Sequence, residues 1–163
     1  MAQYTTQSTV WDSIEANLLS ALDLIKQTGG YNFDIHEIVT WGFDDFPFSG
    51  RWPAAGLVIG REITEDTFAT TVRRCRRDIG IEMWVQGPSG PKRKEATFSR
   101  VYQMIISDIE KALLIDHTRG GYAEDTEISE RSPAVDSQKK LIGAVVRAQV
   151  IYRHKFGDLY TLL

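Results

Sequence analysis

The first pattern along the chain is an amphipathic helix near the N-terminus. Apolar side chains recur every three or four residues from Val10 to Ile25, which is the spacing of one buried stripe on a helix. Ser8 or Thr9 can cap the first turn, and Gly29-Gly30 can supply a left-handed stop. The pattern therefore predicts a helix over about residues 9–28.

The periodicity then changes to that of extended chain. A β-rich run covers residues 38–41, and a second apolar run covers residues 57–61. Apolar and polar side chains alternate in residues 68–72 and again in residues 79–85, which is typical of strands with one buried face. Because the alternation breaks near Asp78, we predict that these last two runs are separate strands that pair with each other.

A second helix and a final strand are predicted in the C-terminal half. Apolar positions repeat with helical spacing through residues 98–114. Residues 117–140 are polar, acidic and longer than most ordered connections, so we expect either a short strand or a mobile arm that binds a partner. Residues 141–152 carry small or apolar side chains on both faces, which predicts a central strand covered on both sides.

This order of elements predicts an α+β fold. The sheet is expected to be mostly antiparallel, with the two amphipathic helices packed on one of its faces. No internal repeat and no linker divides the chain, so we predict a single domain over residues 1–163. A chain of this size buries roughly 70% of its unfolded surface and can form a core without metal or disulfide support.

Composition and charge narrow the class of protein. The chain is 42% hydrophobic and 25% charged, as in ordinary soluble domains. Lys and Arg (19) against Asp and Glu (22) leave a formal charge of −3, which argues against a dedicated nucleic-acid binder. The chain has a single cysteine, and its first residues lack the basic and then apolar pattern of a signal peptide. Its apolar stretches are far shorter than the roughly 20 residues that a membrane span requires. We therefore expect an intracellularly made protein with no membrane partner.

Residues suited to catalysis or metal binding are sparse. The chain has no Gly-x-Ser-x-Gly motif, and His36, His117 and His154 lie singly. Cys75 lies among four arginines, which could lower its thiol pKa, although a cysteine packed in a strand is the more common case. We therefore expect no enzyme activity, no metal and no cofactor.

Two charge clusters of opposite sign are the most prominent features. On a strand, alternate arginines of the basic cluster should project to opposite faces, and an acidic partner would satisfy one set. The basic cluster comprises Arg73, Arg74, Arg76 and Arg77, and the acidic cluster comprises Glu124, Asp125, Glu127 and Glu130.

A contact between identical subunits would use both clusters. In a ring, the basic cluster of one copy can meet the acidic cluster of the next. The alternative is that the two clusters are unrelated solvated surfaces. If the basic cluster lies on an exposed face, replacing Arg73 and Arg76 with Glu should change stability by no more than about 0.5 kcal/mol.

Aromatic side chains crowd one loop. This loop carries more apolar surface than a solvent-exposed loop normally does. It should therefore either fold back over the core or pack against a partner. These side chains are Trp41, Phe43, Phe46, Phe48 and Trp52.

The order of elements resembles that of the tail terminator and tail-completion proteins of long-tailed bacteriophages. An N-terminal helix, strand pairs, a second helix and a Gly-rich polar stretch precede a last strand ending Val150-Ile151-Tyr152-Arg153-His154, and Phe156-Gly157-Asp158-Leu159-Tyr160 follows. The segment from Leu141 to Tyr160 carries most of the resemblance, which covers nearly the whole chain. No single functional residue is carried over from that family.

The resemblance implies a structural virion protein of the tail, assembled in the host cytoplasm. Such a protein forms a ring, expected to contain six copies, that caps the tail tube, ends tube polymerisation and provides the head–tail joining surface. Its partners would be the tail tube protein and the head–tail connector protein, and genomic DNA would pass through the ring without specific binding.

Two other classes of function remain open from the residues. A nucleic-acid-binding module would place Arg73–Arg77 and Lys92–Lys94 on phosphates, although the acidic total opposes it. A small enzyme would use Cys75 or a carboxylate, but no pair of catalytic partners is visible in the sequence.

Overall fold

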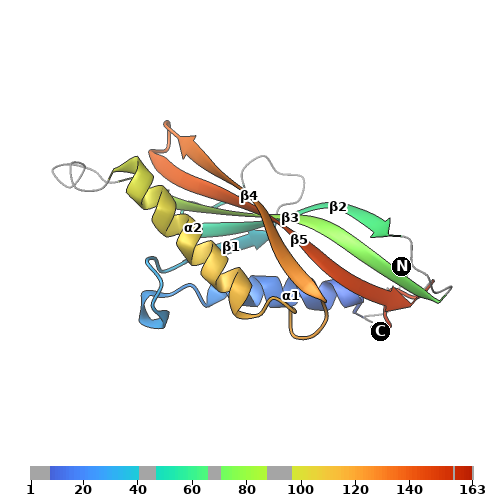
Figure 1. Ribbon diagram of the computed structural model, residues 1–163. Coiled ribbons are helices and arrows are strands. Elements are labelled where there is room, and N and C mark those ends of the chain that lie inside the picture. Colours follow the sequence, from blue (N-terminus) through green and yellow to red (C-terminus); the bar gives the residue numbers. More distant parts are fainter. Residues whose placement is uncertain (1–7, 41–46, 66–70, 88–96, 156, 163) are drawn as a thin grey trace, which may run out of the picture.

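The computed structural model describes residues 8–40, 47–65, 71–87, 97–155 and 157–162. A twisted sheet forms one layer and the helices form the other (Figure 1). The elements in chain order are α1 (Val10–Asp23), the 3-10 turn η1 (Gln27–Gly29), β1 (Glu37–Thr40), β2 (Ala54–Glu65), β3 (Val72–Gln86), α2 (Phe98–Ile115), β4 (Asp125–Asp136) and β5 (Leu141–Lys155).

The sheet has five strands in the order β1-β2-β3-β5-β4. β1 pairs parallel to β2, whereas the β2–β3, β3–β5 and β4–β5 pairs are antiparallel. The predicted α+β class is confirmed, and the sheet is mixed. The two longest strands, β3 and β5, pair along their whole lengths at the centre and so support the elements on either side.

The expectation of two separate strands around Asp78 is wrong. β3 runs without interruption from Val72 to Gln86, while residues 68–70 lie outside the described part of the chain. Asp78 sits directly opposite Gln149, whose side-chain amide donates to the Asp78 carboxylate at 2.8 Å. A polar side chain on the face away from the helices therefore leaves the ladder between β3 and β5 intact. The β2–β3 register, in contrast, shifts opposite Asp78, between Ile59 and Glu62.

Of the two expectations for residues 117–140, the strand is confirmed and the mobile arm is not what the structure shows. Residues 125–136 form β4, an edge strand paired antiparallel with β5. Thr126 is buried and Ile128 packs against the core, while most other β4 side chains are polar. An edge strand needs few apolar positions, which is why its sequence looked like a loop.

Local signals placed the start of α1 correctly but not its end. The Thr9 hydroxyl accepts from the Asp12 amide at 3.1 Å, and Asp12 accepts from the Thr9 amide at 2.6 Å, forming a capping box. The helix ends at Asp23, before the predicted residue 28. Ile25 is fully buried and its carbonyl accepts from the Ile35 amide, so tertiary packing turns the chain earlier than the glycines do.

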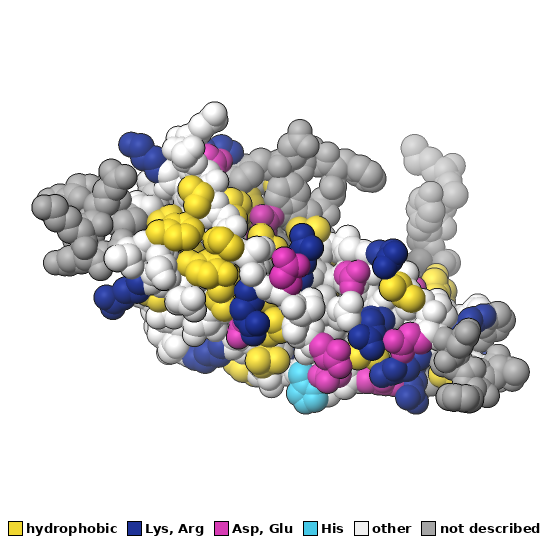
Figure 2. All heavy atoms as spheres, turned by 45° about the horizontal axis from the view of Figure 1, so that its top comes forward, with side chains coloured by type: hydrophobic (Ala, Val, Ile, Leu, Met, Phe, Trp, Pro, Cys, Tyr) yellow, Lys and Arg dark blue, Asp and Glu magenta, His cyan; other side chains and the backbone are white. Residues whose placement is uncertain are grey.

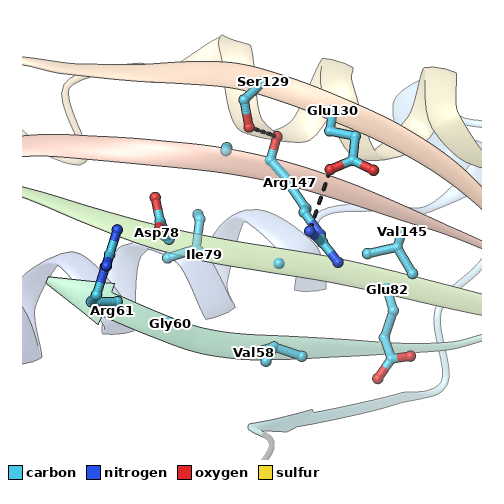
Figure 3. A pocket seen from close by; sticks show the side chains of 12 residues that line it. Val58, Gly60, Arg61, Asp78, Ile79, Glu82, Ser129, Glu130, Val145 and Arg147 are labelled. Carbon is cyan, nitrogen blue, oxygen red and sulfur yellow. Dashed lines mark hydrogen bonds and ion pairs between the residues drawn. The ribbon is translucent and has the colours of Figure 1, made fainter.

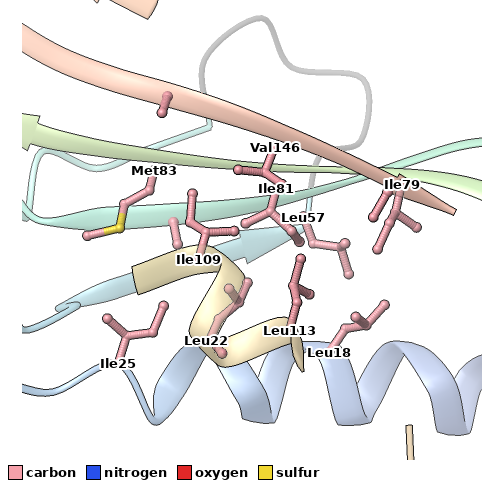
Figure 4. Close-up of a cluster of buried hydrophobic side chains, with 14 of the residues drawn as sticks. Leu18, Leu22, Ile25, Leu57, Ile79, Ile81, Met83, Ile109, Leu113 and Val146 are labelled. Atoms are coloured by element: carbon pink, nitrogen blue, oxygen red, sulfur yellow. The ribbon is translucent and has the colours of Figure 1, made fainter. Parts of the chain in front are cut away.

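The main core lies between the helices and one face of the sheet (Figure 4). Leu18 and Leu22 of α1 and Ile109 of α2 are fully buried against side chains such as Ile81 and Met83 of β3. Burying one such side chain contributes roughly 1.5–3 kcal/mol. The packing of both helices on this face leaves the opposite face of the sheet, which we call the open face, without a helix.

A buried carboxylate ties the segment after η1 to α2. Asp108 is 1% exposed and accepts from the backbone amides of Asn32 and Phe33 at 2.9 and 3.0 Å. It also accepts from the Asn32 side-chain amide at 2.8 Å. Several donors thus compensate the burial of this charge.

A smaller apolar cluster covers one end of the open face. Phe48 and Trp84 are buried there with Ala54 and Leu141, and Trp52 packs against them. Phe48 and Trp52, two of the five aromatic side chains of the loop, therefore pack on the sheet. This agrees with the prediction that the loop folds back over the core. Trp41, Phe43 and Phe46 lie outside the described residues.

Candidate interaction surface

Residues of the open face come from alternate positions of the strands. Along β3 they are Arg74, Arg76, Asp78, Gly80, Glu82 and Trp84. The face has three zones in this order: a charged network, a hollow and the apolar cluster around Trp84. The central strand β5 is helix-covered on one side only, because Arg147 on its other side is exposed, which corrects the expectation of cover on both sides.

The basic cluster divides between the two faces, as strand periodicity predicted. Arg74 and Arg76 lie on the open face, whereas Arg77 lies on the helix side with its guanidinium 4.4 Å from the centre of the Trp11 ring. Arg77 also pairs with Glu62 at 2.7 Å. Arg73 shares the helix-side register with Arg77. The cluster is therefore not one continuous positive surface.

On the open face the arginines pair with carboxylates of the same chain. Arg74 contacts Glu65 at 2.6 Å and Glu124 at 2.8 Å. Arg76 contacts Glu65 at 3.1 Å, Gln149 at 2.8 Å and Glu127 at 3.6 Å. The pKa of Arg74 is raised, chiefly by its hydrogen bond with Glu124. These contacts join β2, β3, β5 and β4 into one charged network.

The rest of the acidic cluster also has partners in its own chain. Glu124 pairs with Arg153 as well as with Arg74. Asp125 lies 3.0 Å from the His117 ring, and Glu130 lies 3.3 Å from Arg147. The contact that the sequence suggested between copies thus forms within one copy. A role for these eight residues at a subunit interface stays a prediction.

The expected exposure of the basic cluster is only partly correct. The side chain of Arg76 is 30% exposed and has three partners. A glutamate at this position would place a carboxylate beside Glu65 and remove all three contacts. Replacing Arg76 with Glu should therefore cost more stability than a change on a fully exposed face.

A hollow of about 610 Å³ occupies the centre of the open face (Figure 3). Its lining side chains come from β2, β3, β4 and β5. The walls are partly apolar, with Val58 from β2 and Val145 from β5, and the rim carries Arg61, Asp78 and the Arg147–Glu130 ion pair.

Gly60 and Gly80 both line this hollow, but only one of the two positions requires glycine for steric reasons. A Cβ atom on Gly60 would lie 2.9 Å from the Asp78 carbonyl oxygen, so the close approach of β2 to β3 requires glycine there. A Cβ atom on Gly80 would meet only the Val58 side chain, at 3.5 Å, which is ordinary contact. The fold would admit a side chain at position 80, and its absence keeps the hollow open.

Glu82 is the buried polar group of this surface. It is 8% exposed, and its Oε2 accepts from the Trp84 indole N–H at 3.0 Å. Its Oε1 has no hydrogen-bond partner among the described residues. Burial raises the pKa of Glu82, and the Trp84 bond only partly opposes the shift. Glu82 is not among the site residues predicted from the sequence, although it lies two residues before Trp84 in a strand with alternating apolar residues.

Cys75 packs in the core on the helix side of the sheet. Its Sγ lies 3.4 Å from His154 Nε2, while His154 Nδ1 donates to the Lys155 carbonyl oxygen at 2.8 Å. In the neutral ring Nε2 is therefore the acceptor for the thiol proton. Cys75 is fully buried, and burial raises its thiol pKa despite the nearby arginines. The interpretation as a packed cysteine is confirmed.

The described residues hold no group of three or more His, Cys, Asp or Glu side chains that could bind a metal ion. Within the same residues, no helix is long and apolar enough to cross a membrane.

Comparisons with known proteins assign no family to this chain. No family model matches it, and no curated protein matches it. It is similar to a chain in a solved structure described as the virion of a native gene transfer agent particle, with 9% sequence identity and a TM-score of 0.37. The match covers 91% of this chain and 95% of that chain. A likeness of this strength assigns neither a fold family nor a function.

Proposed function

We propose that this chain is a structural virion protein that forms a ring at the end of a phage tail. The proposal rests on the sequence resemblance to tail terminator and tail-completion proteins and on the character of the open face. An antiparallel sheet can simply face water on one side. Here that side also holds a hollow with partly apolar walls and a buried carboxylate oxygen without a hydrogen-bond partner among the described residues, and we propose this face as the contact surface.

The β4 edge of the sheet is poorly suited to adding a strand from another molecule. β4 is one of the two edge strands, and its register with β5 is interrupted between Ile128 and Glu130. It also contains Pro133, which has no amide hydrogen to donate. Bulges and prolines of this kind protect edges from pairing with other chains. The open face, and not the β4 edge, is therefore the surface offered to neighbours.

The proposed assembly is a ring of six identical copies. It caps the tail tube, ends tube polymerisation and provides the surface on which the head connector docks. Genomic DNA passes through the ring without specific binding. In this role the chain acts by its surfaces, as a non-enzymatic component of the virion tail assembled in the host cytoplasm.

The contacts do not favour the nucleic-acid-binding alternative. Arg74, Arg76 and Arg77 each have a carboxylate partner within the chain. Binding DNA phosphates through these side chains would first require breaking those ion pairs. Lys92–Lys94, the other basic segment considered, lies outside the described residues.

Tail particles test the proposal directly. Cryo-electron microscopy of tail ends should show a six-fold ring of this protein between the tube and the head, and native mass spectrometry should give the copy number of the purified assembly. Particles produced without the protein should contain tubes of uncontrolled length that carry no heads. A protein found only as an isolated monomer, and never in tail particles, would contradict the proposal.

A further inference from the structure

We infer that the connection between α2 and β4 (residues 116–124) is a conformational switch that carries Arg119 out of the core while the rest of the subunit stays folded. This motion belongs to the single subunit, so it is independent of the proposed ring, and its tests need no assembly.

Arg119 is a buried charge with unmet hydrogen-bond donors. On the face seen in Figure 2, lysine and arginine side chains lie at the surface, many of them beside Asp or Glu. Arg119 is 0% exposed, and no other lysine or arginine of the described residues is buried. Its Nη2 donates to the Leu113 carbonyl oxygen, whereas Nε and Nη1 have no hydrogen-bond partner among those residues. Burying a guanidinium in this way is costly, because its lost hydration is only partly replaced.

The charge of Arg119 is poorly compensated. Burial lowers the pKa of Arg119, and the nearby Asp116 carboxylate opposes that shift only in part. Asp116 itself is already engaged, because it accepts from the side-chain hydroxyl of Thr118 at 2.9 Å and from the Gly120 amide at 2.6 Å. The buried form of Arg119 is therefore a cost to the folded subunit.

The backbone at the same residue is also unfavourable. Arg119 has a φ of 52°, and Gly120 and Gly121 follow at 72° and 84°. Glycine adopts this left-handed region freely, but a residue with a Cβ atom does so at a cost. Backbone strain and an incompletely paired charge thus coincide at one position. Such positions are found in segments that switch between conformations.

Apolar side chains next to Arg119 are exposed instead. Leu114 and Ile115, at the end of α2, are 52% and 65% exposed. The Arg119 guanidinium contacts the carbonyl oxygen of the residue directly before them. One short stretch therefore buries a cation and leaves two aliphatic side chains in water, the reverse of the usual preference. A conflict of this kind between local sequence and packing is expected where a segment has more than one packing.

Few bonds hold the connection to the rest of the chain. Most of its backbone hydrogen bonds close within it, such as those from the Gly121 and Ala123 amides to the Thr118 carbonyl oxygen, at 3.0 and 2.8 Å. The Asn17 side-chain amide of α1, beside which the connection passes (Figure 1), donates to Asp116 at 3.2 Å. The ladder between β4 and β5 begins only after the connection. Opening therefore breaks few contacts with the sheet and helices, so it does not require global unfolding.

Chemical modification of arginine measures the opening directly. Phenylglyoxal reacts with guanidiniums that reach solvent, and peptide mass mapping gives the rate at each residue. In the original protein, the rate at Arg119 should exceed that set by global unfolding. It should not change at low urea concentrations, because a local opening exposes little surface. Arg147, whose side chain is 63% exposed, gives the rate of an accessible arginine. A rate at Arg119 that rises with urea as steeply as global unfolding does would overturn the switch.

Three variants separate the charge of the side chain from its bulk. R119M replaces the buried cation with an apolar side chain and so favours the closed form. The amides of Gly121 and Ala123 should then exchange with deuterium about tenfold or more slowly. R119K keeps the charge and should exchange as fast as the original protein or faster. R61M makes the same change as R119M on an exposed residue of β2 and should leave these amides unaffected. Circular dichroism checks that the variants are folded.

The opposite result for R119M would identify Arg119 as a structural cap of α2. Its loss would then speed the exchange of the same amides and lower the urea midpoint of unfolding. Equal exchange in R119M and R61M would also overturn the switch. If R119M does not fold, the urea dependence of Arg119 modification in the original protein still decides. None of these outcomes depends on whether rings form, so the tail proposal stands or falls on its own experiment.

Discussion

Gly80 and Gly143 are both glycines on the open face, but only Gly143 is required by packing. A Cβ atom on Gly143 would lie 2.7 Å from the Trp84 ring, whereas one on Gly80 would lie 3.5 Å from Val58. The Trp84 ring therefore packs directly on the backbone of β5. A side chain at position 143 must displace that ring and the cluster with Phe48 and Leu141.

We predict opposite effects for the two alanine variants. Gly143→Ala should lower the free energy of unfolding by about 1–3 kcal/mol, as overpacking does. Gly80→Ala should be neutral or raise it by up to about 1 kcal/mol, because glycine in a strand is entropically unfavourable. Urea denaturation of both variants measures the difference. An equal loss in both would show that Trp84 does not pack on Gly143.

Glu82 should make stability depend on pH. Its pKa is raised above 4.5 in the folded state, so the folded protein keeps the proton where the unfolded chain has lost it. The stability that protonated Glu82 contributes is complete below the unfolded pKa and is lost as the pH rises through the raised folded pKa. Above that range, an ionised buried carboxylate destabilises the free subunit.

The E82Q variant isolates this effect. At acid pH the two proteins should have similar free energies of unfolding. As the pH rises from 4 toward neutrality, the free energy of unfolding of E82Q should increase relative to that of the original protein. Urea titrations at a series of pH values measure the difference, with D23N as the control for an exposed carboxylate. If the difference in free energy of unfolding between the two proteins did not change with pH, the pKa of Glu82 would not be raised by folding.

At the scale of elements, β4 shows how an ordered strand can have the sequence of a loop. Its polar side chains face solvent or the charged network, and its order comes from the ladder with β5 and from contacts with α2 such as Arg131–Glu110. The pairs near the turn, such as Asp136 with Leu141, are close in sequence, but neither the ladder nor the contact with α2 needs an apolar pattern in β4. Backbone pairing therefore compensates for the lack of an apolar pattern.

Hydrogen exchange on the isolated subunit tests this order. Alternate amides of residues 125–136, those that bond to β5, should exchange slowly, and the outward amides of this edge strand should exchange fast. The central residues 142–151 should be protected on both sides. Fast exchange at every amide of residues 125–136 would restore the mobile arm that the sequence suggested.

At the scale of the whole molecule, the net charge and the described residues of the open face do not favour binding to nucleic acid. The formal charge is −3, and the arginines of the open face already contact carboxylates. We therefore expect no gel shift of duplex DNA by the protein at about 150 mM salt. Non-specific binding requires lysine and arginine side chains that are free to neutralise phosphates and release the counterions of the DNA. Such a surface suits a ring that lets DNA pass.

A variant without two of the paired carboxylates provides a comparison for the DNA-binding measurement. Replacing both Glu65 and Glu124 with Gln removes the carboxylates that neutralise Arg74, so this variant should bind DNA more strongly than the original protein at low salt. A gel-shift salt series compares the two. A steep, salt-dependent shift by the unmodified protein would support the nucleic-acid alternative instead.

Features set by neighbours in the chain were determined by the sequence alone. The stripe from Val10 to Ile25 and the Thr9 cap predicted α1 because helical contacts lie three or four residues apart. The alternation of Arg73–Arg77 between two faces followed from the two-residue period of a strand. The helix positions and the α+β class were accessible for the same reason.

Features set by distant contacts were decided only by the tertiary structure. The parallel β1–β2 pair, the unbroken β3 and the strand nature of β4 depend on which strands lie side by side, and that choice of neighbours is made by the assembled sheet. Arg74 meets Glu124 across 50 positions of sequence, so the two clusters looked like surfaces of different copies. The hollow and the unpaired oxygen of Glu82 exist only once four strands bring Gly80, Val58 and Val145 together, because burial is a property of the assembled sheet.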